Sequence, residues 1–173
     1  MKFGRAEDLS RVQFDYPHSS IVVSGAVDRE LRFIKTGAPA WGDKGFIGKL
    51  YPKGCKPTEF LKYYAMHFDA IELNTTFYRI PSVDTLRRWC SMVPPAFAFC
   101  PKFPQQVSRA SRLNMQSGIM DDFLQMIDLM GENHGISFLQ LPEHFSIQRK
   151  NELLDFLALL PDHHQFAVEL RHP

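Results

Sequence analysis

Several features that would identify a cofactor enzyme or a membrane protein are missing from this sequence. It has no glycine-rich phosphate loop, no dinucleotide-binding fingerprint and no HExxH-like pair. No apolar run approaches membrane-spanning length, and the polar segment 1–30 does not resemble a signal peptide. These absences predict a protein without a nicotinamide or other cofactor and without a membrane partner.

Cysteine is scarce, and the spacing of the three cysteines does not indicate disulfide bonds. Cys55, Cys90 and Cys100 are odd in number and form no CxxC pair, so they indicate neither a disulfide framework nor a zinc cluster. A small core thiol is a better interpretation of Cys100 than a nucleophile. The default expectation for such a chain is the reducing cytoplasm.

An excess of either charge is also missing. Twenty basic and 19 acidic residues give a net charge of +1, so no general basic field for nucleic acid exists, although local patches stay possible. The 173 residues are 45% hydrophobic, which is sufficient for one sizeable core.

Strand-like and helix-like segments alternate from residue 31 onward, whereas residues 1–30 suggest an irregular lead segment. Proline in a first turn, apolar residues at helical spacing and terminal glycine or proline mark the helix ends. The pattern predicts strands at 31–36, 70–73, 96–100, 136–140 and 165–169, and helices at 57–67, 83–92, 120–130 and 150–160.

Two of these strands carry a glutamate inside an apolar run, Glu72 and Glu169. Because side chains alternate along a strand, both acids lie on the face with small residues, opposite the bulky apolar ones. A carboxylate buried there requires a partner. The gradient from small to polar side chains is typical of the lumen of a parallel barrel with helices outside.

A series of short motifs follows one another over about residues 31–173. They are Gly48-Lys49-Leu50-Tyr51-Pro52, Phe60-Leu61-Lys62-Tyr63-Tyr64-Ala65, Ile71-Glu72-Leu73-Asn74-Thr75-Thr76-Phe77-Tyr78, Pro81, Trp89, Phe97-Ala98-Phe99-Cys100-Pro101-Lys102, Leu139-Gln140-Leu141-Pro142 and Val168-Glu169-Leu170-Arg171-His172. Each motif is weak alone, but together and in this order they resemble the YecE-like proteins, also called domain of unknown function 72.

The resemblance implies a TIM-barrel fold and no established reaction. An eight-stranded barrel needs roughly 250 residues, so residues 31–173 are expected to form an incomplete barrel of about five strands. The missing strands would come from the same chain, if this is a fragment, or from another chain. The unpaired edges predict an aggregation-prone chain that is inactive alone.

Two loops depart from the family pattern. The loop Thr36–Trp41 lacks the usual Gly-Thr-Ser-Gly-Trp-like turn, and Ser108-Arg109 stands where many relatives have Thr-His.

The strongest catalytic candidates are Glu72, Lys102 and Glu169. Glu72 and Lys102 occupy adjacent strands at comparable depths, so a buried ion pair is geometrically easy, with a structural or a catalytic role. Glu72 or Glu169 would act as acid or base, while Lys102 and Arg171 stabilise charge. Arg171 could also grip an anion bidentately.

Neutral and aromatic residues near the strand ends are the candidates for substrate binding. Gln140 points inward if Ile136 and Phe138 share its face. Aromatic loop residues suit either stacking on a ring or plugging the barrel. The predicted binding residues are Asn74, Tyr78, Gln140, Arg171, His172 and Trp41.

Metal binding is not predicted. His163 and His164 precede the last strand, but adjacent histidines point in opposite directions in an extended chain. Exposed turn histidines are the better interpretation.

Three functions follow from these residues. The leading one is an enzyme acting on a small polar or anionic substrate at the carboxyl-end mouth of the barrel. The alternatives are a phosphodiester- or nucleic-acid-processing enzyme, by analogy of fold, and a non-catalytic binding module. A basic surface around the mouth would favour the second, and packed aromatics closing the lumen would favour the third.

Overall fold

The computed structural model describes residues 34–113, 115 and 118–172. The expected lead segment 1–30 and the first three residues of the expected first strand lie outside this part. From Ile34 onward the chain forms one unit. Its strands are β1 (Gly37–Ala38), β2 (Ala70–Leu73), β3 (Ala98–Pro101), β4 (Ile136–Gln140) and β5 (Gln165–Glu169).

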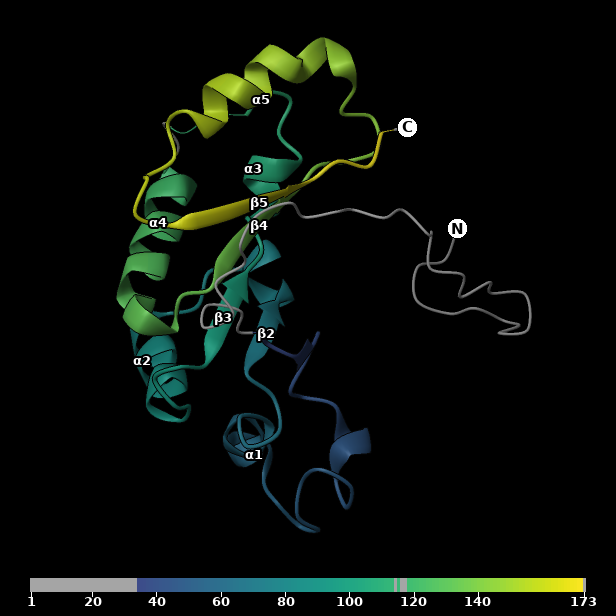
Figure 1. Cartoon of the computed structure of the whole chain (residues 1–173), viewed down its shortest axis with the longest axis vertical. Coiled ribbons are helices and arrows are strands. Elements are labelled where there is room, and N and C mark those ends of the chain that lie inside the picture. Colours follow the sequence, from purple (N-terminus) through teal and green to yellow (C-terminus); the bar gives the residue numbers. More distant parts are fainter. Residues whose placement is uncertain (1–33, 114, 116–117, 173) are drawn as a thin grey trace, which may run out of the picture. The chain divides into compact units, whose positions relative to one another are not determined.

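The helices alternate with these strands (Figure 1). They are α1 (Phe60–Tyr64), α2 (Val83–Ser91), α3 (Gln105–Ser108), α4 (Gly118–Met130) and α5 (Lys150–Leu157). Short 3-10 turns cover Lys44–Phe46, Pro57–Glu59, Asn74–Phe77, Gly131–Asn133 and Ile147–Arg149.

All strand pairs in the described chain are parallel. One sheet has the order β1-β2-β3 and the other pairs β4 with β5. Parallel bridges from Phe99 to His134 and from Lys102 to Phe138 connect β3 with the β4 segment. The fold is therefore α/β with parallel sheets in chain order, and the described residues form no closed barrel.

The first strand was predicted too early. Residues 34–36 are not strand, and the pairing with β2 involves Gly37 and Ala38 instead. A Cβ at position 37 would lie 2.3 Å from the carbonyl oxygen of Ala70. Only glycine permits this approach, so the pairing is fixed by backbone contact, which hydrophobic patterning does not report.

The other boundaries differ less. The bounds predicted for β2, β4 and β5 are confirmed, and β3 begins two residues late because Phe97 closes a turn onto the carbonyl of Pro94. Helix α2 begins after Ser82, whose hydroxyl accepts a hydrogen bond from the backbone of Thr85. Helix α3, which follows Pro104, was not predicted.

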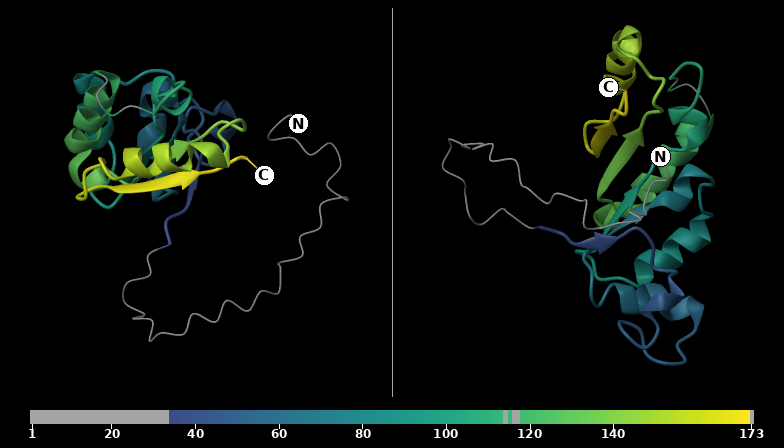
Figure 2. Two further views of the ribbon diagram at one scale, coloured as in Figure 1. Left: turned by 90° about the horizontal axis from the view of Figure 1, so that it is seen from above. Right: turned by 90° about the vertical axis from the view of Figure 1, so that its right-hand side faces the viewer.

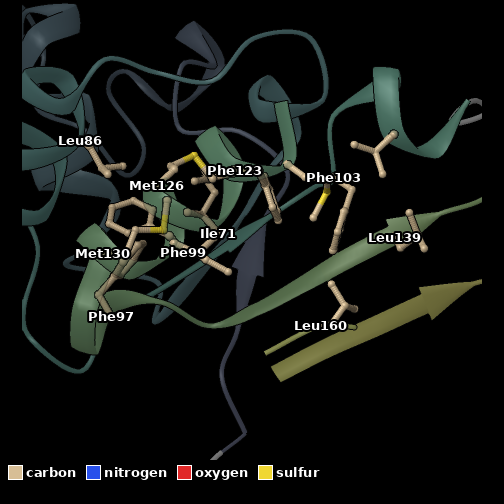
Figure 3. Close-up of a cluster of buried hydrophobic side chains, with 14 of the residues drawn as sticks. Ile71, Leu86, Phe97, Phe99, Phe103, Phe123, Met126, Met130, Leu139 and Leu160 are labelled. Carbon is tan, nitrogen blue, oxygen red and sulfur yellow. The ribbon is translucent and has the colours of Figure 1, made fainter. Parts of the chain in front are cut away.

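The core lies between the strands and helices α2 and α4 (Figure 3). Ile71, Phe99 and Leu139 project from β2, β3 and β4, and Leu86 and Phe123 meet them from the helices. Phe103 and Phe123 stack with ring centroids 4.5 Å apart. This is the face that the alternation of side chains assigns to the bulky residues, and the prediction is confirmed.

Figures 1 and 2 show α2 and α4 on the same side of the strands. On the opposite face, Ala70 lies beside Ala98, and Ala167 lies beside the larger Phe138. Within the part of the chain described, no helix is both long and apolar enough to cross a membrane.

Candidate functional site

The register of β2 and β3 separates Glu72 from Lys102. Glu72 is aligned with Cys100, so Lys102 stands two residues, or about 6.6 Å, farther along its strand. The expected ion pair between Glu72 and Lys102 is wrong: no such contact exists among residues 34–172 that are described, and the Glu72 side chain is exposed. Exposure to water removes the need for a buried counter-charge.

Lys102 instead begins a chain of hydrogen bonds across β3, β4 and β5. Its Nζ donates to Oε1 of Gln140 at 2.6 Å, and Nε2 of Gln140 donates to Oε2 of Glu169 at 2.5 Å. Nε of Arg171 donates to the other oxygen of Glu169 at 2.6 Å. Lysine only donates and a carboxylate only accepts, so the two contacts together fix the orientation of the Gln140 amide.

Gln140 was predicted to point inward if Ile136 and Phe138 share its face, and they do. Ile136 and Phe138, on its face of β4, line one hollow of about 450 Å³ together with Glu72 and Glu169. Both glutamates therefore lie on the face away from α2 and α4, as the alternation predicts. Cys100 also lines this hollow, but burial raises the pKa of its thiol, which disfavours a nucleophilic role.

The charges around the chain of hydrogen bonds shift two pKa values. Burial lowers the pKa of Lys102; Arg171 and Arg109 add to this effect, while Glu72 and Glu169 oppose it. Burial alone would raise the pKa of Glu169, but the hydrogen bonds from Gln140 and Arg171 outweigh it, so that pKa is lowered. At neutral pH the site holds an ionised carboxylate and a lysine that releases its proton more easily than usual.

Two cations share the ring of Phe77. Nζ of Lys102 lies 4.7 Å from the ring centroid and the guanidinium carbon of Arg109 lies 4.9 Å from it. Such distances are typical of cation–π contacts. Neither cation forms an ion pair with any carboxylate of the described residues.

A second hollow, of about 540 Å³, lies where these cations meet the ends of β4 and β5. Arg109 and Arg171 line it together with the Phe77 ring and Gln140, and the remaining lining residues are Leu141, Pro142, Glu143 and His144. This hollow is at the carboxyl ends of the parallel strands, where α/β proteins bind ligands. We call the hollow and Lys102 the mouth site.

The aromatic candidates behave differently from one another. Trp41 packs edge-on against Trp89, with ring centroids 5.1 Å apart, and lines a hollow of about 270 Å³ with Asn74. Tyr78 is 69% exposed and packs edge-on against Phe77.

His172, the last described residue, is exposed. The structure thus gathers Lys102, Gln140, Glu169 and Arg171 and leaves Trp41, Asn74 and Tyr78 outside that network.

The two adjacent histidines do not point in opposite directions. His163 belongs to a turn and His164 to a bend rather than to extended chain, and Nε2 of each ring faces the same oxygen of Asp128, at 3.4 and 2.7 Å. The reason given for dismissing a shared ligand is therefore wrong. The turn between α5 and β5 directs both rings toward Asp128.

Sequence reasoning overlooked Arg109, Phe77 and His144 as mouth residues. One feature of the sequence could have indicated Arg109, because it lies in one of the two loops that depart from the family pattern. Phe77 was recognised only as a loop aromatic. Nothing in the sequence placed His144 near Arg109, since that proximity depends on the packing of separate loops.

Comparison with known proteins gives a consistent result. The family model described as protein of unknown function DUF72 matches residues 35–173. The UPF0759 protein YecE of Escherichia coli K12 is 34% identical over 113 residues, covering 65% of this chain and 42% of its own length.

Solved structures agree on the fold. A DUF72 family protein from Thermotoga maritima superimposes with a TM-score of 0.60 at 30% identity, covering 79% of this chain and 55% of its own. Another from Enterococcus faecalis V583 gives a TM-score of 0.64 at 20% identity, covering 80% and 50%. The chain thus spans about half the length of these relatives, and the family match over residues 35–173 shows that it belongs to the DUF72 family.

Proposed function

We propose that the chain contributes five strands of a (β/α)8 barrel whose mouth site binds a small anionic substrate and performs acid/base chemistry on it. The parallel strands in chain order, with bridges between β3 and β4, support the barrel arrangement. Strands from outside residues 34–172, in the same or another chain, would complete it. The three free cysteines are compatible with a cytoplasmic location.

The single observation that carries the proposal is the pair of cations on Phe77. Lys102 and Arg109 lie within 5 Å of one ring centroid and have no carboxylate partner among the described residues. Gathering like charges costs free energy, which an oxyanion bound between them would offset. Guanidinium and ammonium groups are the usual ligands of phosphate and carboxylate.

The proton-transfer groups stand beside this anion site. Glu169 is held as a carboxylate by the hydrogen bonds from Gln140 and Arg171, so it is ionised and can accept a proton, while Lys102 donates to the same Gln140 as a cation. In this arrangement Glu169 or Glu72 accepts a proton from the substrate, while Lys102, Arg109 and Arg171 stabilise the negative charge that develops.

A phosphodiester substrate is the second candidate, because the same cations suit a phosphate within a nucleic acid. The mouth also contains His144 and Glu143, so the group is not uniformly basic. A short single-stranded oligonucleotide competing with inorganic phosphate would favour this candidate. A binding module closed by aromatics has less support, since Tyr78 is mostly exposed.

A thermal-shift titration with inorganic phosphate tests the proposal. Phosphate should raise the Tm of the wild-type protein, and the double variant Lys102→Gln/Arg109→Gln should lose most of this response. The control Lys62→Gln/Arg79→Gln removes the same charge from exposed positions and should respond like the wild type. Equal responses in all three proteins would reject the anion site.

A further inference from the structure

Three metal-ligating side chains meet at the opposite end of the strands from the mouth site. Asp128 belongs to the last turns of α4, and His163 and His164 lie in the segment just before β5. Their ligand atoms all lie within 4.8 Å of one another. Among the described residues, no other group of three or more histidine, cysteine, aspartate or glutamate side chains lies close enough to hold a metal ion.

The geometry is close to that of a coordinated ion. Ligands of a tetrahedral zinc ion at about 2.0–2.1 Å are separated by about 3.3 Å. Oδ1 of Asp128 and Nε2 of His163 are 3.4 Å apart, and Nε2 of His164 is 2.7 Å from the same oxygen. The shorter of these two separations must widen slightly to admit an ion, and all three ligand atoms already lie within 4.8 Å of one another.

Both imidazoles present the correct atom. A carboxylate only accepts hydrogen bonds, so Nε2 of His164 carries the proton that it shares with Asp128. To bind a metal ion through the Nε2 lone pair, the ring would shift this proton to Nδ1 or release it to water. The rings of His163 and His164 lie 4.3 Å apart, side by side despite their adjacency in sequence.

We propose that Asp128, His163 and His164 form a binding site for a divalent transition-metal ion, with Zn²⁺ as the best fit. Two imidazoles and one carboxylate are borderline-soft ligands that suit Zn²⁺ better than Mg²⁺ or Ca²⁺, which prefer oxygen alone. His134 packs edge-on against His164, but its Nε2 contacts the Ser137 hydroxyl, so it is not one of the proposed ligands. Water would complete the coordination of the ion.

The position predicts a structural rather than a catalytic role. The amino-end face of a parallel barrel is associated with stability, and the mouth site lies at the other end. An ion bound there joins the end of α4 to the segment that leads into β5. Because β5 pairs with β4, this link would restrain β5 at the edge of its sheet.

Calorimetric titration of metal-free protein with Zn²⁺ tests the site. We expect one ion per chain in the wild type and at least about tenfold weaker binding in Asp128→Asn and in His164→Gln. The control His67→Gln removes an exposed histidine elsewhere and should bind like the wild type. Equal affinity in wild type and Asp128→Asn would mean a surface ion pair only, and would overturn the proposal.

Cobalt gives a readout that does not depend on stability. Co²⁺ bound by two imidazoles and a carboxylate in four- or five-coordinate geometry should show visible ligand-field absorption, which Asp128→Asn should lose. Asp128 is 59% exposed, so its amide replacement should leave the fold intact, as circular dichroism without metal can verify. A wild-type spectrum identical to that of aqueous Co²⁺ would contradict the site.

Discussion

The amino group of Lys102 and the side-chain amide of Gln140 lie 2.6 Å apart, on neighbouring strands of the carboxyl-end mouth. This contact replaces the ion pair that the sequence suggested and leaves the charge of Lys102 unneutralised. Gln140 also donates to Glu169, so one neutral amide separates a cation from an anion while contacting both. Several consequences of this arrangement can be measured.

Replacing Gln140 with leucine should destabilise the protein by about 1–2 kcal/mol, because two hydrogen bonds to charged groups are lost together. Unfolding in urea at neutral pH measures the change. Gln125→Leu alters an exposed position of α4 and should change the free energy of unfolding by less than about 0.5 kcal/mol. Equal effects of the two substitutions would mean that the amide contacts contribute nothing.

Stability should fall on acidification through the titration of Glu169. Its folded-state pKa lies below the unfolded value, so its contribution is present above the unfolded pKa and is lost as the pH falls through the folded one. Since the side chain is 45% exposed, the loss should be only about 0.5–1 kcal/mol.

The variant Glu169→Gln isolates this contribution. Between neutral pH and about pH 3 it should lose less free energy of unfolding than the wild type, whereas Glu132→Gln, an exposed control, should behave like the wild type. A pH dependence unchanged by Glu169→Gln would show that the carboxylate is not stabilised by its neighbours.

Gly37→Ala should weaken the pairing of β1 with β2. The added methyl group would lie 2.3 Å from the carbonyl oxygen of Ala70, and relieving this overlap should cost about 1–3 kcal/mol. Gly42→Ala is the matched control, because a Cβ there meets nothing within 4 Å. Urea unfolding should separate the two variants, and similar stabilities would contradict the observed pairing.

The 173-residue chain should associate as its concentration rises. In the described structure β5 pairs only with β4, and Leu154, Leu159 and Leu170 are each more than half exposed. Sedimentation should detect the association, and Leu154→Glu/Leu159→Glu should reduce it. A monomer with a cooperative thermal transition at every concentration would instead show that these elements are stable alone.

Much of the fold could be predicted because local patterns determine it. Alternation located β2, β4 and β5 and assigned Glu72 and Glu169 to the open face. The first strand was missed because close backbone contact at Gly37, rather than hydrophobicity, fixes it. The partners of Lys102 were missed because they depend on the register of the strands. Lys102 lies two residues beyond the position aligned with Glu72, and the sequence alone does not give this alignment of β2 with β3.

The candidate sites illustrate the same limit. Arg171 follows Glu169 by two residues, just past the end of β5, so their contact follows from the sequence. Arg109 and Phe77 are far apart in sequence and meet only through packing. The turn before β5 likewise brings His163 and His164 to one side, where an extended chain would have separated them.

The location of a bound oxyanion tests the proposed mouth site most directly. Tungstate has the tetrahedral shape of phosphate, and its heavy atom can be located by anomalous diffraction from soaked crystals. We expect it within hydrogen-bonding distance of Lys102 and Arg109, over the Phe77 ring, and absent from crystals of Arg109→Gln. Tungstate bound only at other surfaces, with the mouth site empty at saturating concentration, would contradict the proposal that this site binds an anionic substrate.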